Sequence, residues 1–189
     1  MRKKILFLAG MMACCSLAGA QEISKTWVAD KGNGTYQNPV LHADYSDPDV
    51  CAAGDDFYMT ASSFNCIPGI PILHSNDLVN WSLVNYALPI QEPEEFFDKA
   101  QHGKGVWAPA IRFHNGEFYI YWGDPDYGIY MIKAKDPKGR WSKPVLVKAG
   151  KGMIDPTPLW DEDGKVYLVH AYAGSRSGVN TVSYTHLRA

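Results

Sequence analysis

From about residue 38 onward, short runs rich in Tyr, Val, Ile, Phe and Trp alternate with turns that contain Gly, Asp and Asn. Runs of this length and composition, bounded by such turns, are typical of β-strands. One stretch favours a helix, the brief and charged segment from Glu92 to Ala100. Because helices do not alternate with the strands, a barrel of alternating strands and helices is excluded. The pattern predicts an all-β fold.

Three segments of this pattern align with one another: DPDVCAAGDDFYMT from Asp47, APAIRFHNGEFYIYW from Ala108 and DPTPLWDEDGKVYLVH from Asp155. Each has a residue followed by Pro, then a strand, a turn that contains Gly, and a second strand that includes a Tyr. They start 61 and 47 residues apart. Repeats of this length with about four strands are typical of β-propeller blades. A β-sandwich is the structural alternative, but sandwiches do not repeat a unit of two hairpins at this period.

The first positions of the three segments are candidates for a site. In a propeller the innermost strand of each blade starts at the rim of the central channel, so equivalent first positions converge on one axis. Asp47, Ala108 and Asp155 would then place two carboxylates and one small residue around a common pocket. Pro48 disfavours the helical region for Asp47, so we expect Asp47 to enter its strand in an extended conformation.

The start of the chain is typical of an export signal. Basic residues 2–4 precede an apolar run over residues 5–17 and the small residues Ala18-Gly19-Ala20. We therefore expect residues 1–20 to be a signal peptide and the protein to be periplasmic or extracellular. Lipid anchoring through Cys14 or Cys15 is the less favoured alternative, because Met12-Ala13 is a poor lipoprotein context. No later stretch is long and apolar enough to predict a membrane span.

Residues 21–37 are expected to form an N-terminal arm and residues 38–180 a partial propeller. The segment 181–189 breaks the repeat pattern and is interpreted as a non-native tail. Cys51 and Cys66 follow the predicted signal, and the sequence leaves open whether they pair. The net charge of −2 argues against a nucleic-acid partner. Aromatic residues make up 13% of the chain, which suits both sugar stacking and propeller cores.

Two carboxylates that face one cleft, in an exported and aromatic-rich protein, point to glycoside hydrolysis. Several motifs then carry a resemblance to a known family, namely Asn38-Pro39-Val40-Leu41, Asp47-Pro48-Asp49, Gly54-Asp55-Asp56-Phe57-Tyr58, residues 68–81 around His74-Ser75 and Asp77-Leu78, and Trp107-Ala108-Pro109 with Ile111. Together these motifs resemble glycoside hydrolase family 43 over about residues 38–180.

The resemblance implies a five-bladed β-propeller, of which this chain would hold about the first three blades. It also implies hydrolysis with inversion, acting on xylosidic or arabinofuranosidic bonds of plant cell-wall polysaccharide. By motif, Asp47 is the general base and Asp155 orients the general acid and tunes its pKa. The acid itself is expected to be a Glu beyond the end of this chain, because no Glu follows Glu162 and Glu162 lies in a predicted hairpin turn. The chain alone is therefore expected to be inactive.

Four further residues are candidates for substrate binding: Trp107, Asp49, Phe64 and Arg176. Trp107 either stacks on a sugar ring or packs between blades. Asp49 lies two residues after Asp47 on the same strand face, and structural hydrogen bonds are its alternative role. Phe64 is followed by Asn65-Cys66 where many relatives place an aromatic residue. The aromatic surface on which those relatives stack a sugar ring is therefore expected to differ here. Arg176 either holds hydroxyl groups or lies in a solvated turn.

Alternative functions stay open at this point. The chain could belong to a propeller that binds sugars without catalysis, or to a purely structural or interaction propeller. A retaining relative of the invertase type is disfavoured, because it would carry Asn-Asp-Pro-Asn where this chain has Ser-Asp-Pro-Asp. No metal ligands and no cofactor are assigned from the sequence, although the resemblance allows a structural calcium ion in the channel. The expected partner is an oligo- or polysaccharide.

Overall fold

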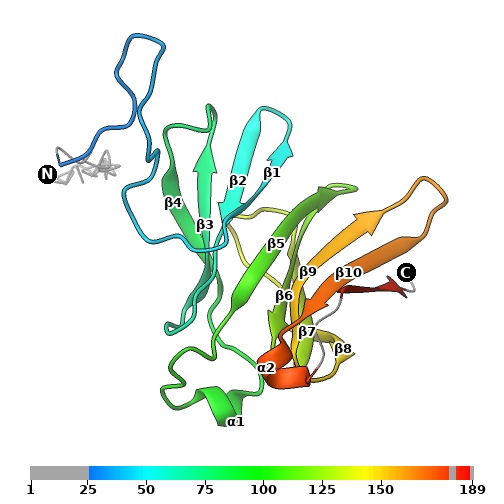
Figure 1. Ribbon diagram of the computed structural model, residues 1–189. Coiled ribbons are helices and arrows are strands. Elements are labelled where there is room, and N and C mark those ends of the chain that lie inside the picture. The colour runs from blue at the N-terminus through cyan, green and yellow to red at the C-terminus, as the bar shows by residue number, and fades with distance from the viewer. Residues whose placement is uncertain (1–25, 179–181, 188–189) are drawn as a thin grey trace, which may run out of the picture.

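The computed structural model describes residues 26–178 and 182–187, and these residues form an almost entirely β structure (Figure 1). Its strands are β1 (Asp49–Ala53), β2 (Asp56–Thr60), β3 (Gly69–Ser75), β4 (Ser82–Leu88), β5 (Trp107–His114), β6 (Glu117–Asp124), β7 (Gly128–Ala134), β8 (Val145–Ala149), β9 (Met153–Trp160), β10 (Val166–Tyr172) and β11 (Val182–Leu187). Two helices of one turn each are present, α1 (Glu94–Phe97) and α2 (Gly174–Ser177). The all-β prediction is confirmed.

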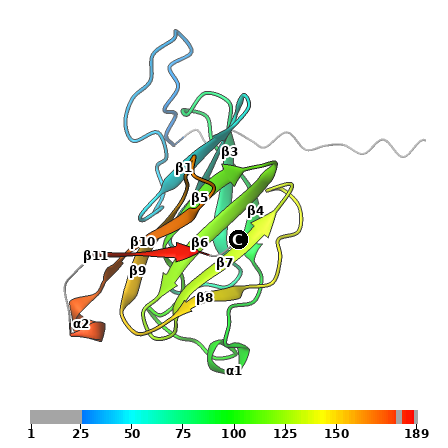
Figure 2. The same ribbon diagram turned by 90° about the vertical axis from the view of Figure 1, so that its right-hand side faces the viewer.

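The strands form three antiparallel sheets in chain order: β1-β2-β3-β4, β5-β6-β7-β8 and β9-β10-β11. We call these sheets blade 1, blade 2 and blade 3. Figures 1 and 2 show the blades next to one another, with the first strand of each blade contacting that of its neighbour. This radial stacking of meander sheets is the arrangement that the sequence repeat predicts.

The hairpins follow from local turn chemistry. In the turn between β5 and β6, Asn115 and Gly116 both have left-handed backbones, with φ of 48° and 78°. Positive φ at both central residues is the geometry of the tight turns that match the twist of antiparallel strands, and Asn-Gly is the favoured pair for it. This turn fixes which faces of β5 and β6 pack against the neighbouring blades.

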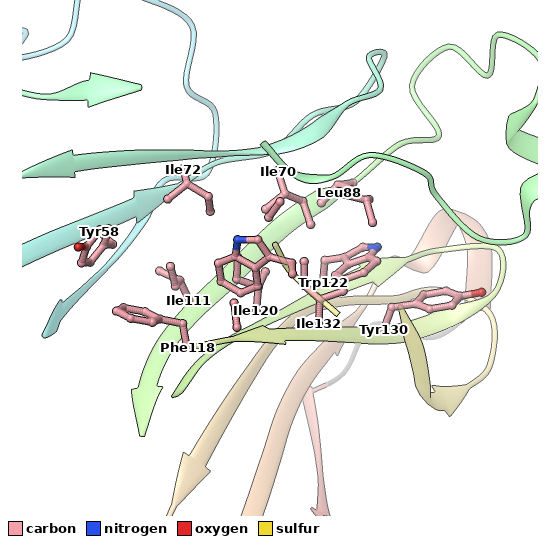
Figure 3. Close-up of a cluster of buried hydrophobic side chains, with 14 residues drawn as sticks. Tyr58, Ile70, Ile72, Leu88, Ile111, Phe118, Ile120, Trp122, Tyr130 and Ile132 are labelled. Carbon is pink, nitrogen blue, oxygen red and sulfur yellow. The ribbon is translucent and has the colours of Figure 1, made fainter. Parts of the chain in front are cut away.

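The main core lies between blade 1 and blade 2 (Figure 3). Ile70, Ile72 and Leu88 of blade 1 are fully buried against blade 2, where Ile120 and Trp122 are also fully buried. At about 25 cal/mol for each Å² of apolar surface removed from water, each such side chain contributes roughly 1.5–3 kcal/mol. A second, smaller cluster contains Tyr121 and Ile129 of blade 2 and Met153 and Leu168 of blade 3. Blade-to-blade burial therefore holds the fold together.

The helix that the sequence predicts over Glu92–Ala100 is wrong in extent, because α1 covers only four of its residues. Pro93 stands at the helix N-cap with an extended backbone, at φ −73° and ψ 134°. Because the residue before a proline is disfavoured in the helical region, Glu92 is excluded from the helix. The segment closes after one turn, where the Asp98 N–H donates to the Glu94 carbonyl.

The ends of the chain are only partly described. The predicted signal peptide lies outside the described residues. Residues 26–37 form a small loop in which Asp30 pairs with Tyr36, and Asn80 of the β3–β4 turn donates to Asp30 at 2.9 Å. Within the expected tail, Val182–Leu187 forms β11, which pairs with β10. Its non-native origin stays a prediction.

Cys51 and Cys66 are both free. Among the described residues, no helix is long and apolar enough to cross a membrane.

Candidate active site

The three aligned positions share an unusual backbone. Asp47, Ala108 and Asp155 each precede a proline and have left-handed φ values of 50°, 37° and 53°. The expectation of an extended Asp47 is therefore wrong. Pairing in blades 2 and 3 shifts register near Ala108 and near Asp155, which marks β-bulges at these two positions. The local preference before proline is extended, and the strand pairing overrides it here. Bulges redirect side chains and are common next to active sites.

Hydrogen bonds hold the Asp47 carboxylate from one side. The Ser62 hydroxyl donates to Asp47 Oδ2 at 2.7 Å, and Ser46 Oγ lies 3.1 Å from the same oxygen. Ser62 Oγ in turn accepts a hydrogen bond from the Ala108 N–H at 2.9 Å. The first positions of blade 1 and blade 2 are thus joined through one hydroxyl group.

Asp155 lies in the electrostatic field of Asp47. Partial burial raises the pKa of Asp155, and the negative charge of Asp47 raises it further. Like charges disfavour each other's ionised form when they are close, so the two carboxyl groups share one region. The structure thereby brings together the two carboxylates that the sequence repeat placed at equivalent positions, although they are 108 residues apart.

Trp107 and Phe64 form an aromatic pair beside these positions. Their ring centroids are 6.0 Å apart in an edge-to-face arrangement, and both side chains are half-buried. The Trp107 Nε1–H donates to the Gly103 carbonyl at 3.0 Å, which fixes the orientation of the ring. The pair joins blade 1 to the start of β5 and leaves part of each ring exposed. Sugar contact by either residue stays a prediction.

Asp49 points into the junction between blades 1 and 2. Its Oδ2 accepts from the Ile111 N–H at 2.7 Å and forms an ion pair with Arg112. These are the structural hydrogen bonds that were the alternative role for this residue. A contact with sugar stays a prediction.

Arg176 lies in α2 and pairs with Asp126 in the turn after β6, at 2.7 Å from Nη1 to Oδ1. Lys104 Nζ lies 3.9 Å from the other oxygen of the same carboxylate. The ion pair between Arg176 and Asp126 joins blade 3 to blade 2. The start of α2 lies next to the start of β9, since the Ala173 N–H donates to the Gly152 carbonyl at 2.7 Å. Arg176 is already paired, and its role toward hydroxyl groups stays a prediction.

Sequence reasoning missed Ser62 and the buried Asp124. Asp124 ends β6 and is 2% exposed. Its Oδ1 accepts from the N–H groups of Asp126 and Tyr127, while its Oδ2 has no partner in the part of the chain described. Burial raises the pKa of Asp124 to about 6. Asp124 lies in the motif Asp124-Pro125-Asp126-Tyr127-Gly128, which is typical of an exposed turn, and nothing in that motif indicates burial.

Within residues 26–178 and 182–187, no three His, Cys, Asp or Glu side chains are grouped closely enough to hold a metal ion.

A cavity of about 710 Å³ lies elsewhere, between the N-terminal arm and blade 1, where Trp27, His42 and Trp81 are among its lining residues. Asp47 and Asp155 do not line this cavity. A propeller encloses its channel only when the ring of blades closes, so an enclosed pocket at these carboxylates is not expected from three blades alone.

Comparisons with known proteins agree with this geometry. A 38% identical β-xylosidase of Formosa agariphila matches 86% of this chain. A non-reducing end α-L-arabinofuranosidase of Bacteroides ovatus is 38% identical over 71% of it. A solved family structure from a capybara gut metagenome superimposes with a TM-score of 0.65 at 33% identity, covering 78% of this chain and 29% of that one.

These matches extend over only 29% and 26% of the two curated relatives, so the chain spans less than a third of their length. The solved relatives are five-bladed β-propellers, which confirms the propeller prediction. The model of glycosyl hydrolases family 43 matches residues 36–189. The chain therefore belongs to glycosyl hydrolases family 43.

Proposed function

We propose that this chain supplies part of the active site of an inverting glycoside hydrolase that cleaves xylosidic or arabinofuranosidic bonds of plant cell-wall polysaccharide. The observation that carries the proposal is the pair of carboxylates at matched left-handed positions, with Asp47 close enough to raise the pKa of Asp155. The β-xylosidase and α-L-arabinofuranosidase relatives support the choice of bonds.

In the proposed mechanism, Asp47 accepts a proton from a water molecule as that water attacks the anomeric carbon. The bond to the leaving oxygen breaks, and a Glu from later blades gives that oxygen its proton. Asp155 orients this acid. A nearby negative charge also keeps a carboxylic acid protonated to higher pH, which suits an acid that must donate near neutrality.

The stereochemistry of the product tests this mechanism. We expect the full-length protein to release xylose from nitrophenyl β-xyloside first as the α-anomer, followed over time by NMR, because water attacks opposite the leaving group. The β-anomer as first product would instead show that a carboxylate forms a covalent intermediate. Binding of xylo-oligosaccharides with no hydrolysis of xylosides or arabinofuranosides would favour the sugar-binding propeller.

We also propose that the chain alone does not turn over substrate, because the general acid is expected from later blades. Export through residues 1–20 is a further proposal, supported by their basic, apolar and small-residue pattern. Processing after Ala20, read by N-terminal sequencing of the mature protein, is the expected result.

A further inference from the structure

We propose that Ser62 is a positioning residue that fixes which oxygen of Asp47 faces the attacking water. This inference rests on the proposed role of Asp47 as general base. Ser62 follows β2 and is half-buried. Its hydroxyl lies between two of the aligned positions, Asp47 and Ala108.

The direction of the hydrogen bonds follows from elementary chemistry. The Ala108 N–H can only donate, so Ser62 Oγ is the acceptor of that bond. The hydroxyl proton is then directed at Asp47 Oδ2, 2.7 Å away. A carboxylate that accepts from a hydroxyl whose orientation is set by a backbone amide is held in one rotamer.

The other carboxylate oxygen stays available. Both hydroxyl contacts of Asp47, from Ser62 and Ser46, are made to Oδ2. In the part of the chain that the structure describes, Oδ1 has no hydrogen-bond partner. Oδ1 is therefore the oxygen that accepts the proton of the attacking water, while Oδ2 anchors the group. A catalytic base must be held within about 0.5 Å of its productive geometry, and hydrogen bonds to its other oxygen provide such positioning.

The backbone around Ser62 makes this anchor rigid. The Ser62 N–H donates to the Ser46 carbonyl at 2.9 Å, and Ser63 exchanges two hydrogen bonds of 3.0 Å with Val106. Gly105 lies so close to this segment that a Cβ there would meet the Ser63 carbonyl oxygen at 2.2 Å. Ser62 is thus held by backbone contacts from both blades, and Ala108, the one aligned position without a carboxylate, contributes through its N–H.

The test uses the full-length protein and nitrophenyl glycosides. We expect Ser62→Ala to lower kcat by about 10- to 100-fold with KM changed less than about threefold, because the base is misplaced while the sugar contacts are kept. Ser62→Thr keeps the hydroxyl and is expected to recover most of the rate. Amide hydrogen exchange at Ala108 should become faster in Ser62→Ala and return toward wild type in Ser62→Thr.

Ser63→Ala is the matched control. The Ser63 hydroxyl also accepts a backbone hydrogen bond, from the Ile70 N–H at 2.9 Å, but it contacts no carboxylate. We expect it to retain near wild-type kcat. Equal losses of kcat in Ser62→Ala and Ser63→Ala would show a merely structural role and overturn the inference.

Two further outcomes separate this inference from the proposed function. If Asp47→Asn is inactive but Ser62→Ala keeps wild-type kcat, the positioning role alone is wrong. If Asp47→Asn keeps its rate, the proposed base is wrong and Ser62 has no base to position. If Ser62→Ala does not fold, Ser62→Thr decides: an unchanged Ala108 exchange rate with a tenfold loss of kcat would contradict the inference.

Discussion

At the scale of single residues, the repeat located the aligned positions but not their conformation. The pattern of a residue followed by Pro found Asp47, Ala108 and Asp155. Hydrogen bonds through Ser62 link Asp47 to Ala108, and the charge of Asp47 raises the pKa of Asp155. Their left-handed backbones were not predictable, because the local preference before proline is extended and neighbouring strands override it. Ser62 was not predictable either, since the Ala108 N–H that orients it lies 46 residues away.

Asp124 gives a prediction about stability and pH. A carboxyl whose pKa is about 6 in the folded protein and about 4 when unfolded binds more protons in the native state between these values. Stability is therefore expected to fall as pH rises from about 4 to about 6, by roughly 2 kcal/mol from this residue, and to level off above that range.

Asp124→Asn should lack this component of the pH dependence. Chemical unfolding of the full-length protein at pH 4.5 and 7.5 measures it, with the exposed Asp163→Asn as control, because the pKa of Asp163 is lowered by Lys165 and shifts in the opposite sense. An unchanged difference between the two pH values in Asp124→Asn would contradict the assignment.

At the scale of elements, strands were predicted well and the helix poorly. A strand can be predicted from the composition of a few residues and the turn residues that flank them. The extent of α1, in contrast, depended on the position of Pro93 at its N-cap. Contacts between elements could not be read from sequence. Asp49 and Arg176 were candidates for sugar binding, but their partners Arg112 and Asp126 lie 63 and 50 residues away. Both ion pairs join one blade to the next.

The Asp49 contacts predict a loss of stability rather than of substrate affinity. Asp49→Ala leaves the Ile111 N–H without its acceptor and the partly buried Arg112 without its partner. We expect the free energy of unfolding to fall by about 1–3 kcal/mol, with KM within about twofold of wild type. Glu117→Ala, which breaks the solvent-exposed pair with Lys133 within blade 2, should cost less stability than Asp49→Ala. A large rise in KM for Asp49→Ala would show that this residue contacts sugar.

At the scale of the whole molecule, the period of the repeat predicted a propeller, because each blade is one supersecondary unit whose faces are buried only by its neighbours. The core between blades 1 and 2 and the smaller cluster between blades 2 and 3 follow from that arrangement (Figure 3). The choice between xylosidic and arabinofuranosidic bonds could not be predicted, because in a propeller loops from several blades surround the channel. What this chain supplies is an anchored carboxylate, Asp47, beside a second carboxylate whose pKa is raised.

The central claim is that Asp47 is the general base, and the variant Asp47→Asn in the full-length protein tests it most directly. The amide keeps the shape of the side chain but accepts protons poorly. Turnover of nitrophenyl β-xyloside and α-L-arabinofuranoside is expected to fall by at least about 1,000-fold, while binding of product or unreactive oligosaccharide, measured by calorimetry, stays within about threefold of wild type. Near wild-type turnover by Asp47→Asn would contradict the account.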